Sequence, residues 1–159
     1  MKCSAKFEIH LHGSHMVGLP RRDIEFFLKT GQRRVEVRAF FEGREIKFHA
    51  ALQKRKGGYF IMFSKAKQKA LHLFPGNYFH LQLCEDQTAF GVEIPPELQE
   101  TFSQWPEAHA AFLELSDGSK RSLIYGIARY KTPQKRVDKS LQICERLSQG
   151  IRKTRNLLN

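Results

Sequence analysis

Apolar and polar residues alternate along much of the first half of the chain, which is the pattern of half-buried β-strands. Strands are predicted at residues 5–12, 33–41, 44–52, 59–63, 78–84 and 88–93, and residues 59–63 alternate little, which is consistent with burial on both faces. Only Glu42 and Gly43 separate the second strand from the third, and glycine supplies the positive φ that a two-residue hairpin turn requires. About six or seven strands within the first 94 residues predict a small closed β-barrel.

Short helices and loops are expected between these strands. Pro20 can open a helix that ends at Gly31, and Ser64 can cap a helix over residues 65–73. The polar stretch 53–58, QKRKGG, is expected to be a loop. Residues 19–41 and 63–83 then share one plan, since each leads from a strand end through a basic helix to a turn and a strand. We interpret them as two related units that pack around a pseudo-dyad.

From residue 95 the apolar spacing becomes helical. Leu98, Phe102 and Trp105 are four and three residues apart, and a helical hairpin is predicted over residues 120–147. Pro133 divides this hairpin, because Thr132 can cap the second helix and proline is tolerated at its first position. The apolar stripe of that helix is predicted to consist of Val137, Leu141, Cys144 and Leu147. The tail after residue 150 is expected to be a partly ordered arm.

These patterns predict an α+β protein with two parts. Residues 1–94 form the β-barrel domain, and residues 95–159 form a helical segment that packs on it. The formal net charge is +11, and its distribution is uneven. Residues 1–94 carry 16 basic and 9 acidic side chains. Residues 95–118 carry 5 acidic side chains and no basic one, and residues 119–159 carry 11 basic and 2 acidic side chains. Two basic blocks flanking an acidic connector favour a polyanion such as nucleic acid as partner.

The candidate anion-binding residues fall into two groups. The first lies at strand ends in the barrel half and consists of Arg21, Arg22, Lys54, Arg55, Lys65 and Lys67, with Lys56 and Lys69 beside them. The second lies in the helical hairpin and includes Lys120, Arg121, Tyr125 and Arg136. Interleaved tyrosines would suit base stacking as well as phosphate contact. The alternative is that both groups are solvated surface that keeps the protein in solution.

Several chemistries find no support in the sequence. No glycine-rich phosphate loop and no serine nucleophile elbow occurs, and we expect no catalysis and no cofactor. His10, His12 and His15 are close in sequence, but no third metal ligand has a credible spacing, so no metal site is predicted. Cys3, Cys84 and Cys144 are an odd number without metal-site spacing, which indicates reduced thiols and a cytoplasmic location. The apolar runs are too short for membrane insertion.

Several segments together resemble the YdeI/OmpD-associated family, whose members carry a domain of unknown function, type 1905, before a helical segment linked to bacteriocin protection. In the first half the resemblance rests on FEIHLHG, GLPRRDI, VEVRAFFEGREI, GGYFIMFSKAKQKALHL, PGNYFHLQLCED and VEIPPEL. In the second half it rests on AHAAFLELSDGSKRSLIYGI, and within it most on residues 120–125. The resemblance implies a bacterial protein with a small barrel, an appended helical bundle and no established activity. The barrel half is also similar to swapped-hairpin, AbrB-like double-split barrels.

Three functional hypotheses follow. The first is a non-enzymatic binding protein for a polyanion such as nucleic acid. The second is a binder of a small anionic ligand, or an enzyme, with a pocket between barrel and hairpin where Arg121, Tyr125 and Arg136 converge. The third, which comes from the resemblance, is an adaptor in stress or bacteriocin protection. The sequence leaves the oligomeric state open.

Overall fold

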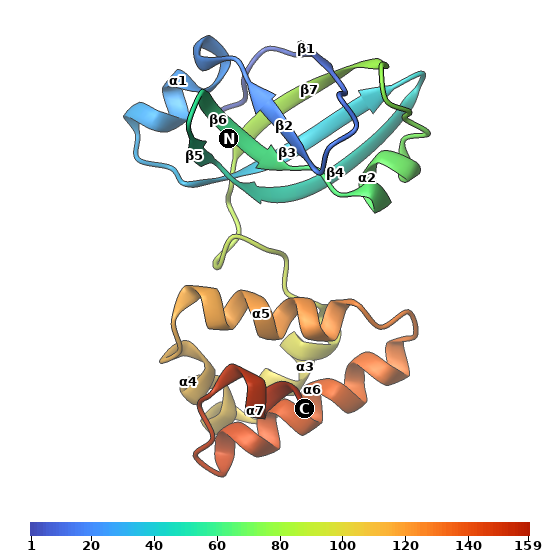
Figure 1. The fold of residues 1–159 in the computed structure, drawn as a ribbon. Helices are drawn as coiled ribbons and strands as arrows, with labels where there is room; N and C mark the ends of the chain where they lie inside the picture. Colours follow the sequence, from blue (N-terminus) through green and yellow to red (C-terminus); the bar gives the residue numbers. More distant parts are fainter. The chain divides into compact units, whose positions relative to one another are not determined.

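The computed structural model describes residues 1–159, which form two compact units, Met1–Gln87 and Thr88–Asn159 (Figure 1). The α+β class predicted from the sequence is confirmed, with two antiparallel sheets and seven helices. The strands of the first unit are β1 (Phe7–His10), β2 (Met16–Leu19), β3 (Arg34–Phe41), β4 (Arg44–Ala51), β5 (Gln53–Arg55), β6 (Gly58–Met62) and β7 (Tyr78–Glu85). Its helices are α1 (Arg21–Lys29) and α2 (Lys65–Ala70).

The strands of the first unit pair into a four-stranded sheet, in the order β1-β7-β3-β4, and a three-stranded sheet, in the order β2-β6-β5. One apolar core receives side chains from both sheets, and the rings of Phe63 and Phe79 stack in it with centroids 5.3 Å apart. The expected closure into a single barrel is not established by this pairing. The two segments of similar plan within this first unit are β2-α1-β3 and β6-α2-β7. Their equivalent strands pair antiparallel, β2 with β6 and β3 with β7.

The turn between β3 and β4 has the predicted form. Phe41 pairs with Arg44, and Glu42 and Gly43 between them have φ angles of 47° and 77°. Two other predictions were wrong. Gln53–Arg55 is an edge strand and not a loop, since pairing with β6 satisfies its backbone without requiring an apolar face. Residues 88–93 form no strand, because Phe90 and Val92 pack into the core of the second unit.

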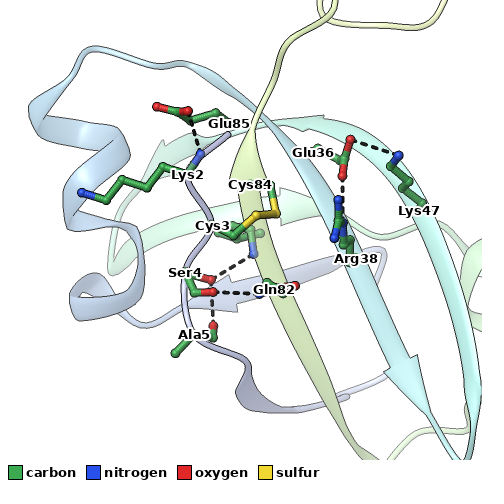
Figure 2. The surroundings of a disulfide bond; sticks show 11 residues. Lys2, Cys3, Ser4, Ala5, Glu36, Arg38, Lys47, Gln82, Cys84 and Glu85 are labelled. Carbon is green, nitrogen blue, oxygen red and sulfur yellow. Dashed lines mark hydrogen bonds and ion pairs between the residues drawn. A yellow bond between two sulfur atoms is a disulfide. The ribbon is translucent and has the colours of Figure 1, made fainter.

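A disulfide joins Cys3 to Cys84 (Figure 2), which corrects the prediction of reduced, unpaired thiols. Cys3 and Cys84 face each other as an antiparallel bridge, with Cα atoms 4.0 Å apart. Around it the Ser4 amide donates to the Leu83 carbonyl at 2.7 Å, and the Glu85 amide donates to the Lys2 carbonyl at 2.9 Å. The first residues are thereby fastened along β7. Cys144 is the free cysteine, and it is buried.

The second unit is helical. Its helices are α3 (Pro96–Gln104), α4 (Pro106–Leu113), α5 (Asp117–Ala128), α6 (Pro133–Ser148) and α7 (Thr154–Leu158). The start of α6 is as predicted, since the Thr132 side chain accepts a hydrogen bond from the Lys135 amide and Pro133 takes the first position. The predicted stripe was wrong at Leu141, which is 46% exposed. Ile143 and Ser140 are buried instead, while Cys144 and Leu147 are buried as predicted, so the buried stripe runs through residues 140, 143, 144 and 147.

The tail after residue 150 is an ordered part of this unit, contrary to expectation. Leu157 of α7 is fully buried, and Leu158 lies against Gly126 of α5. The Arg146 guanidinium donates to the Leu157 carbonyl at 3.0 Å, and the Lys139 ammonium donates to the Leu158 carbonyl. These cations satisfy carbonyls at the end of α7, so the last turn is both packed and capped. None of the helices combines the length and hydropathy that a membrane crossing requires.

Candidate anion-binding surface

The basic residues predicted at strand ends in the first unit lie at two ends of the sheet β2-β6-β5. In this sheet Tyr59 lies between Leu19 and Lys54, so the start of α1 and strand β5 are at one end. Met62 pairs with Met16 at the other end, where the chain continues into α2 (Figure 1). Arg21, Arg22, Lys54 and Arg55 therefore belong to one end, and Lys65 and Lys67 to the other.

The four basic residues at the β5 end are exposed. Two of them have polar partners within the unit. Arg22 Nε lies 3.3 Å from Asp23 Oδ2, and the Arg55 guanidinium donates to Gln53 Oε1 at 3.1 Å. No aromatic side chain at this end is largely exposed, and Tyr59 is half-buried. This end is a charged surface without a stacking platform.

The α2 end contains a groove of about 500 Å³. Its lining is one helical turn and the loop that follows it, and consists of Lys65, Gln68, Lys69, His72, Leu73, Phe74 and Pro75. Phe74 is 70% exposed, the most exposed of the large hydrophobic side chains. No aspartate or glutamate lines the groove. The combination is an open aromatic face with two lysines and a histidine around it.

Local structure explains why Phe74 points outward. The Ser64 side chain caps α2 by accepting a hydrogen bond from the backbone amide of Lys67. The buried side-chain amide of Gln68 donates to the carbonyls of Ser14 and Phe63 at 2.8 and 2.9 Å. These bonds anchor a helix that is too short to be stable alone. His72 then adopts a φ of 59°, which ends the helix and turns Leu73 into the core. The next residue, Phe74, is consequently left outside.

A turn holds this exposed ring in place. The Phe74 amide donates to Asn77 Oδ1 at 2.7 Å, and the Asn77 amide donates back to the Phe74 carbonyl at 3.1 Å. Pro75 and Gly76 complete the turn, with a φ of 93° at Gly76 that favours glycine. The backbone beneath the ring is thus ordered by reciprocal bonds. An exposed aromatic on a fixed turn loses little conformational freedom when a ligand stacks on it.

The three lysines of α2 differ in their surroundings. The Lys65 ammonium donates to the Gly13 carbonyl, and Lys69 is exposed. Lys67 is half-buried with its ammonium 4.7 Å from the centre of the Phe48 ring, and burial lowers the pKa of this lysine. Lys67 does not line the groove, so the cations available there are Lys65 and Lys69.

The buried carboxylate of Glu36 is paired with cations outside α2. Glu36 is buried and contacts Arg38 at 2.8 Å and Lys47 at 3.3 Å (Figure 2). Burial by itself raises the pKa of Glu36, but the hydrogen bonds from these two cations outweigh it and lower that pKa below its ordinary value. None of the ion pairs involves a lysine of α2. With 16 basic and 8 acidic side chains, residues 1–87 carry a net charge of +8, compared with +3 for residues 88–159.

The predicted residues of the second unit take part in contacts within that unit. Lys120 is only 8% exposed, with its ammonium 3.6 Å from Asp117 Oδ1 and 5.1 Å from the centre of the Phe90 ring. The Arg121 guanidinium donates to the Phe90 carbonyl at 3.2 Å. Tyr125 is 51% exposed on α5. These contacts give Lys120 and Arg121 a role in holding residues 88–94 against the helices.

Arg136 has the most complete set of internal partners. Its Nε donates to Glu97 Oε1 at 2.9 Å, and its Nη1 donates to the carbonyls of Tyr130 and Lys131 at 2.8 and 3.1 Å. A backbone hydrogen bond is the largest influence that lowers the pKa of Glu97, and the Arg136 guanidinium lowers it further. Arg136 therefore joins the start of α3 to the loop between α5 and α6. Arg136 donates to Glu97 and Arg121 donates to the Phe90 carbonyl, so the two guanidinium groups have different partners.

Residues 91–150 match the family model described as bacteriocin-protection, YdeI or OmpD-associated. The match covers less than half of the chain and supports a similarity of this segment to the YdeI family. This YdeI segment runs from the stretch before α3 to the residue after α6, and it contains the hairpin on which the resemblance chiefly rested. The assignment of the first half to the type 1905 domain stays a prediction, because the YdeI match begins at residue 91.

Other comparisons place fewer constraints on the chain. No curated protein matches it. A solved structure, described as the solution structure of PHS018 from Pyrococcus horikoshii, is 22% identical, covers 54% of this chain and 94% of its own, and superimposes with a TM-score of 0.43. The groove at α2 lies outside the YdeI segment, so the family match does not bear on it.

Sequence reasoning missed two residues of the groove, His72 and Phe74. The predicted helix over residues 65–73 placed His72 inside its last turn, whereas α2 ends at Ala70. The signal for Phe74 was present in the sequence as an aromatic residue directly before a Pro-Gly turn. That signal was not sufficient, since Leu73 also lies between α2 and β7 and is buried.

Proposed function

We propose that this protein is a non-enzymatic binding protein and that the α2 groove binds single-stranded nucleic acid. The observation that carries the proposal is the exposed ring of Phe74 in a groove that Lys65 and Lys69 also line and that contains no carboxylate. Single-stranded nucleic acids bind proteins through stacking on aromatic rings and through phosphate contacts with basic side chains. Both kinds of group are available here within residues 65–74.

A single strand fits this surface better than a duplex. Stacking on Phe74 requires an accessible base face, which an intact duplex conceals within its own stack. Lys65 and Lys69 are four residues apart on α2 and so lie on one side of the helix. A phosphate next to the stacked base can contact this side. Because the contacts are to a generic base face and to phosphate, we expect little sequence preference.

The test is fluorescence anisotropy with a labelled 12-nucleotide single strand and the full chain at low salt. Replacing Phe74 with alanine should weaken binding by about tenfold or more, since a base–aromatic stack contributes ~1–3 kcal/mol. Lys69→Ala should weaken binding and reduce its salt dependence by about one counterion. The matched control is Lys29→Ala, which removes the same charge from a lysine 72% exposed and paired with Glu25 at 3.0 Å.

Two results would overturn the proposal. One is no binding of the wild-type chain to single-stranded DNA or RNA at low salt. The other is equal weakening by Lys69→Ala and Lys29→Ala with no effect of Phe74→Ala, which would mean that net charge alone attracts the strand. After the second result, in which the strand still binds, the basic surface at the β5 end with Arg21 and Lys54 would be tested next.

A small anionic ligand is a second candidate, favoured by the size of the groove. About 500 Å³ lies within the range of small-molecule sites, and Leu73, Phe74 and Pro75 supply an apolar floor beside the lysines. Competition with a mononucleotide distinguishes the two candidates. A small-ligand site is filled by the mononucleotide as well as by the strand, whereas a strand-binding surface gains affinity with strand length. The predicted site formed by Arg121, Tyr125 and Arg136 stays a prediction.

The wider role is also a proposal. The YdeI match is consistent with a bacteriocin-protection role in a bacterium. The cytoplasmic location was inferred partly from unpaired cysteines, and the Cys3–Cys84 disulfide removes that reason. An oxidising compartment such as the periplasm favours a disulfide of this kind. Fractionating cells that express the full chain, with thiol trapping at lysis, tests the location and the oxidation state together.

A further inference from the structure

Two histidines lie side by side on the outer face of the four-stranded sheet. His10 is the last residue of β1 and His12 follows two residues later, so the alternation of the strand places both on the face opposite Ile9 and Leu11. His10 Nδ1 lies 3.4 Å from His12 Nε2, and the two rings are perpendicular with centroids 4.4 Å apart. Ile9 and Leu11 are buried, which fixes the backbone beneath the pair.

The surroundings orient this pair without covering it. The ring of His10 lies 4.6 Å from that of Tyr78, its cross-strand partner on β7. His12 is exposed. One imidazole is therefore held against a neighbouring strand while the other is open to solvent, so a ligand can reach the nitrogen atoms that face each other.

The distance between these nitrogens suits a shared metal ion. Zinc binds imidazole nitrogen at about 2.0–2.1 Å, and tetrahedral geometry then separates two such nitrogens by about 3.3–3.4 Å. We propose that His10 and His12 form a two-histidine site for a divalent transition metal such as Zn²⁺ or Ni²⁺. Imidazole is a favoured ligand of both metals. The site is independent of the α2 groove and of any function proposed for it.

Metal binding requires tautomers that leave both facing nitrogens without a hydrogen. A hydrogen bond between the two rings places a hydrogen on one of these nitrogens, and which nitrogen carries it depends on the tautomers. That hydrogen moves through solvent to the second nitrogen of the same ring, so that both facing nitrogens present lone pairs to the ion. Two neutral imidazoles bind in this way without net release of a proton.

The remaining coordination positions come from outside the pair. No group of three or more histidine, cysteine, aspartate or glutamate side chains converges in the structure. Water would complete the coordination, and those positions stay open to exchange. The pair therefore forms an exchangeable surface site and not a closed structural one. His15 does not join it, because the chain turns at Gly13, with a φ of 91°, and the His15 carbonyl accepts from the Phe63 amide.

The test is isothermal titration of the full chain with Zn²⁺, and separately Ni²⁺, in a buffer that does not bind metals. We expect one ion per chain and a loss of affinity of tenfold or more in His12→Ala, whose exposed side chain is dispensable for folding. His10→Ala should behave in the same way. The matched controls are His15→Ala and His80→Ala, which remove exposed histidines outside the pair and should leave binding unchanged.

The proposal is overturned by any of three outcomes. These are no binding of the wild-type chain at millimolar metal, binding that His12→Ala leaves intact, and equal weakening in the His15→Ala control. Circular dichroism of each variant identifies a loss of fold, and in that event His12→Gln, which keeps a polar side chain of similar length, decides the question.

Discussion

Opening the disulfide between Cys3 and Cys84 should destabilise the first unit and leave the second unit unchanged. The double variant Cys3→Ala, Cys84→Ala removes the bond permanently, and treatment of the wild-type chain with a reducing agent removes it without changing the sequence. The bond lies entirely within Met1–Gln87. Its loss leaves the hydrogen bonds of Ser4 and Lys2 as the remaining attachment of the first residues to β7.

The magnitude follows from the size of the loop that the bond closes. The cysteines are 81 residues apart, so the disulfide restricts nearly the whole first unit in its unfolded state. Loop-closure entropy for a ring of this size corresponds to about 4.5 kcal/mol at 25 °C. A typical domain is stable by about 5–15 kcal/mol, so the reduced unit would lose roughly a third of its stability or more.

The two units can be followed separately in one urea titration. Trp105 is the single tryptophan and lies in the second unit, so its fluorescence reports that unit alone. Hydrogen exchange of peptides from β3 and β7 reports the first unit. Reduction should lower the free energy of opening in these peptides by several kcal/mol while the fluorescence midpoint stays constant. Cys144→Ala is the control that removes a cysteine and keeps the disulfide.

The reasoning would be refuted by a loss below about 1 kcal/mol in the exchange of β3 and β7. It would equally be refuted if the reduced wild-type chain and the double variant differed strongly, because both lack the same link. A shift in the Trp105 transition alone would place the effect in the wrong unit.

Three further predictions concern the second unit. Arg136→Ala should destabilise it by about 2–3 kcal/mol in urea unfolding, because Glu97, whose side chain is 13% exposed, loses its cation. Gly126→Val should cost about 1–3 kcal/mol by the same measurement, since even a Cβ there would lie 2.4 Å from Leu158. Burial raises the pKa of Cys144 to about 11 from an ordinary 9.0. The folded chain then retains a proton that the unfolded chain releases, so stability should fall as pH rises from 9 toward 11, and Cys144→Ala should abolish that fall.

Local pattern was sufficient for most of the elements. The alternation in residues 33–52 and the glycine at position 43 predicted the β3–β4 hairpin correctly, because a two-residue turn and a buried face determine the register together. The cap and proline at the start of α6 were equally readable. Strand β5 was not, since an edge strand needs only backbone partners and its polar side chains resemble those of a loop.

The candidate surface was only partly predictable. Lys65 was named from charge alone, but charge did not tell it apart from Arg22 and Arg55 at the other end of the sheet. Arg136 was expected to face a ligand, and its donors are directed to Glu97 and two carbonyls. Sequence reports that a side chain carries charge, whereas its partner depends on which segments the fold brings within hydrogen-bonding distance.

By itself the sequence determined an α+β protein with a strand-rich first half, a helical second half and an excess of positive charge. These properties depend on residues close together in the chain. Only the tertiary structure paired Cys3 with Cys84, left Phe74 outside the core and brought the facing nitrogens of His10 and His12 to 3.4 Å. Each of these depends on the path of the backbone. That path is decided by the packing of many segments into a common core, and no single segment determines it alone.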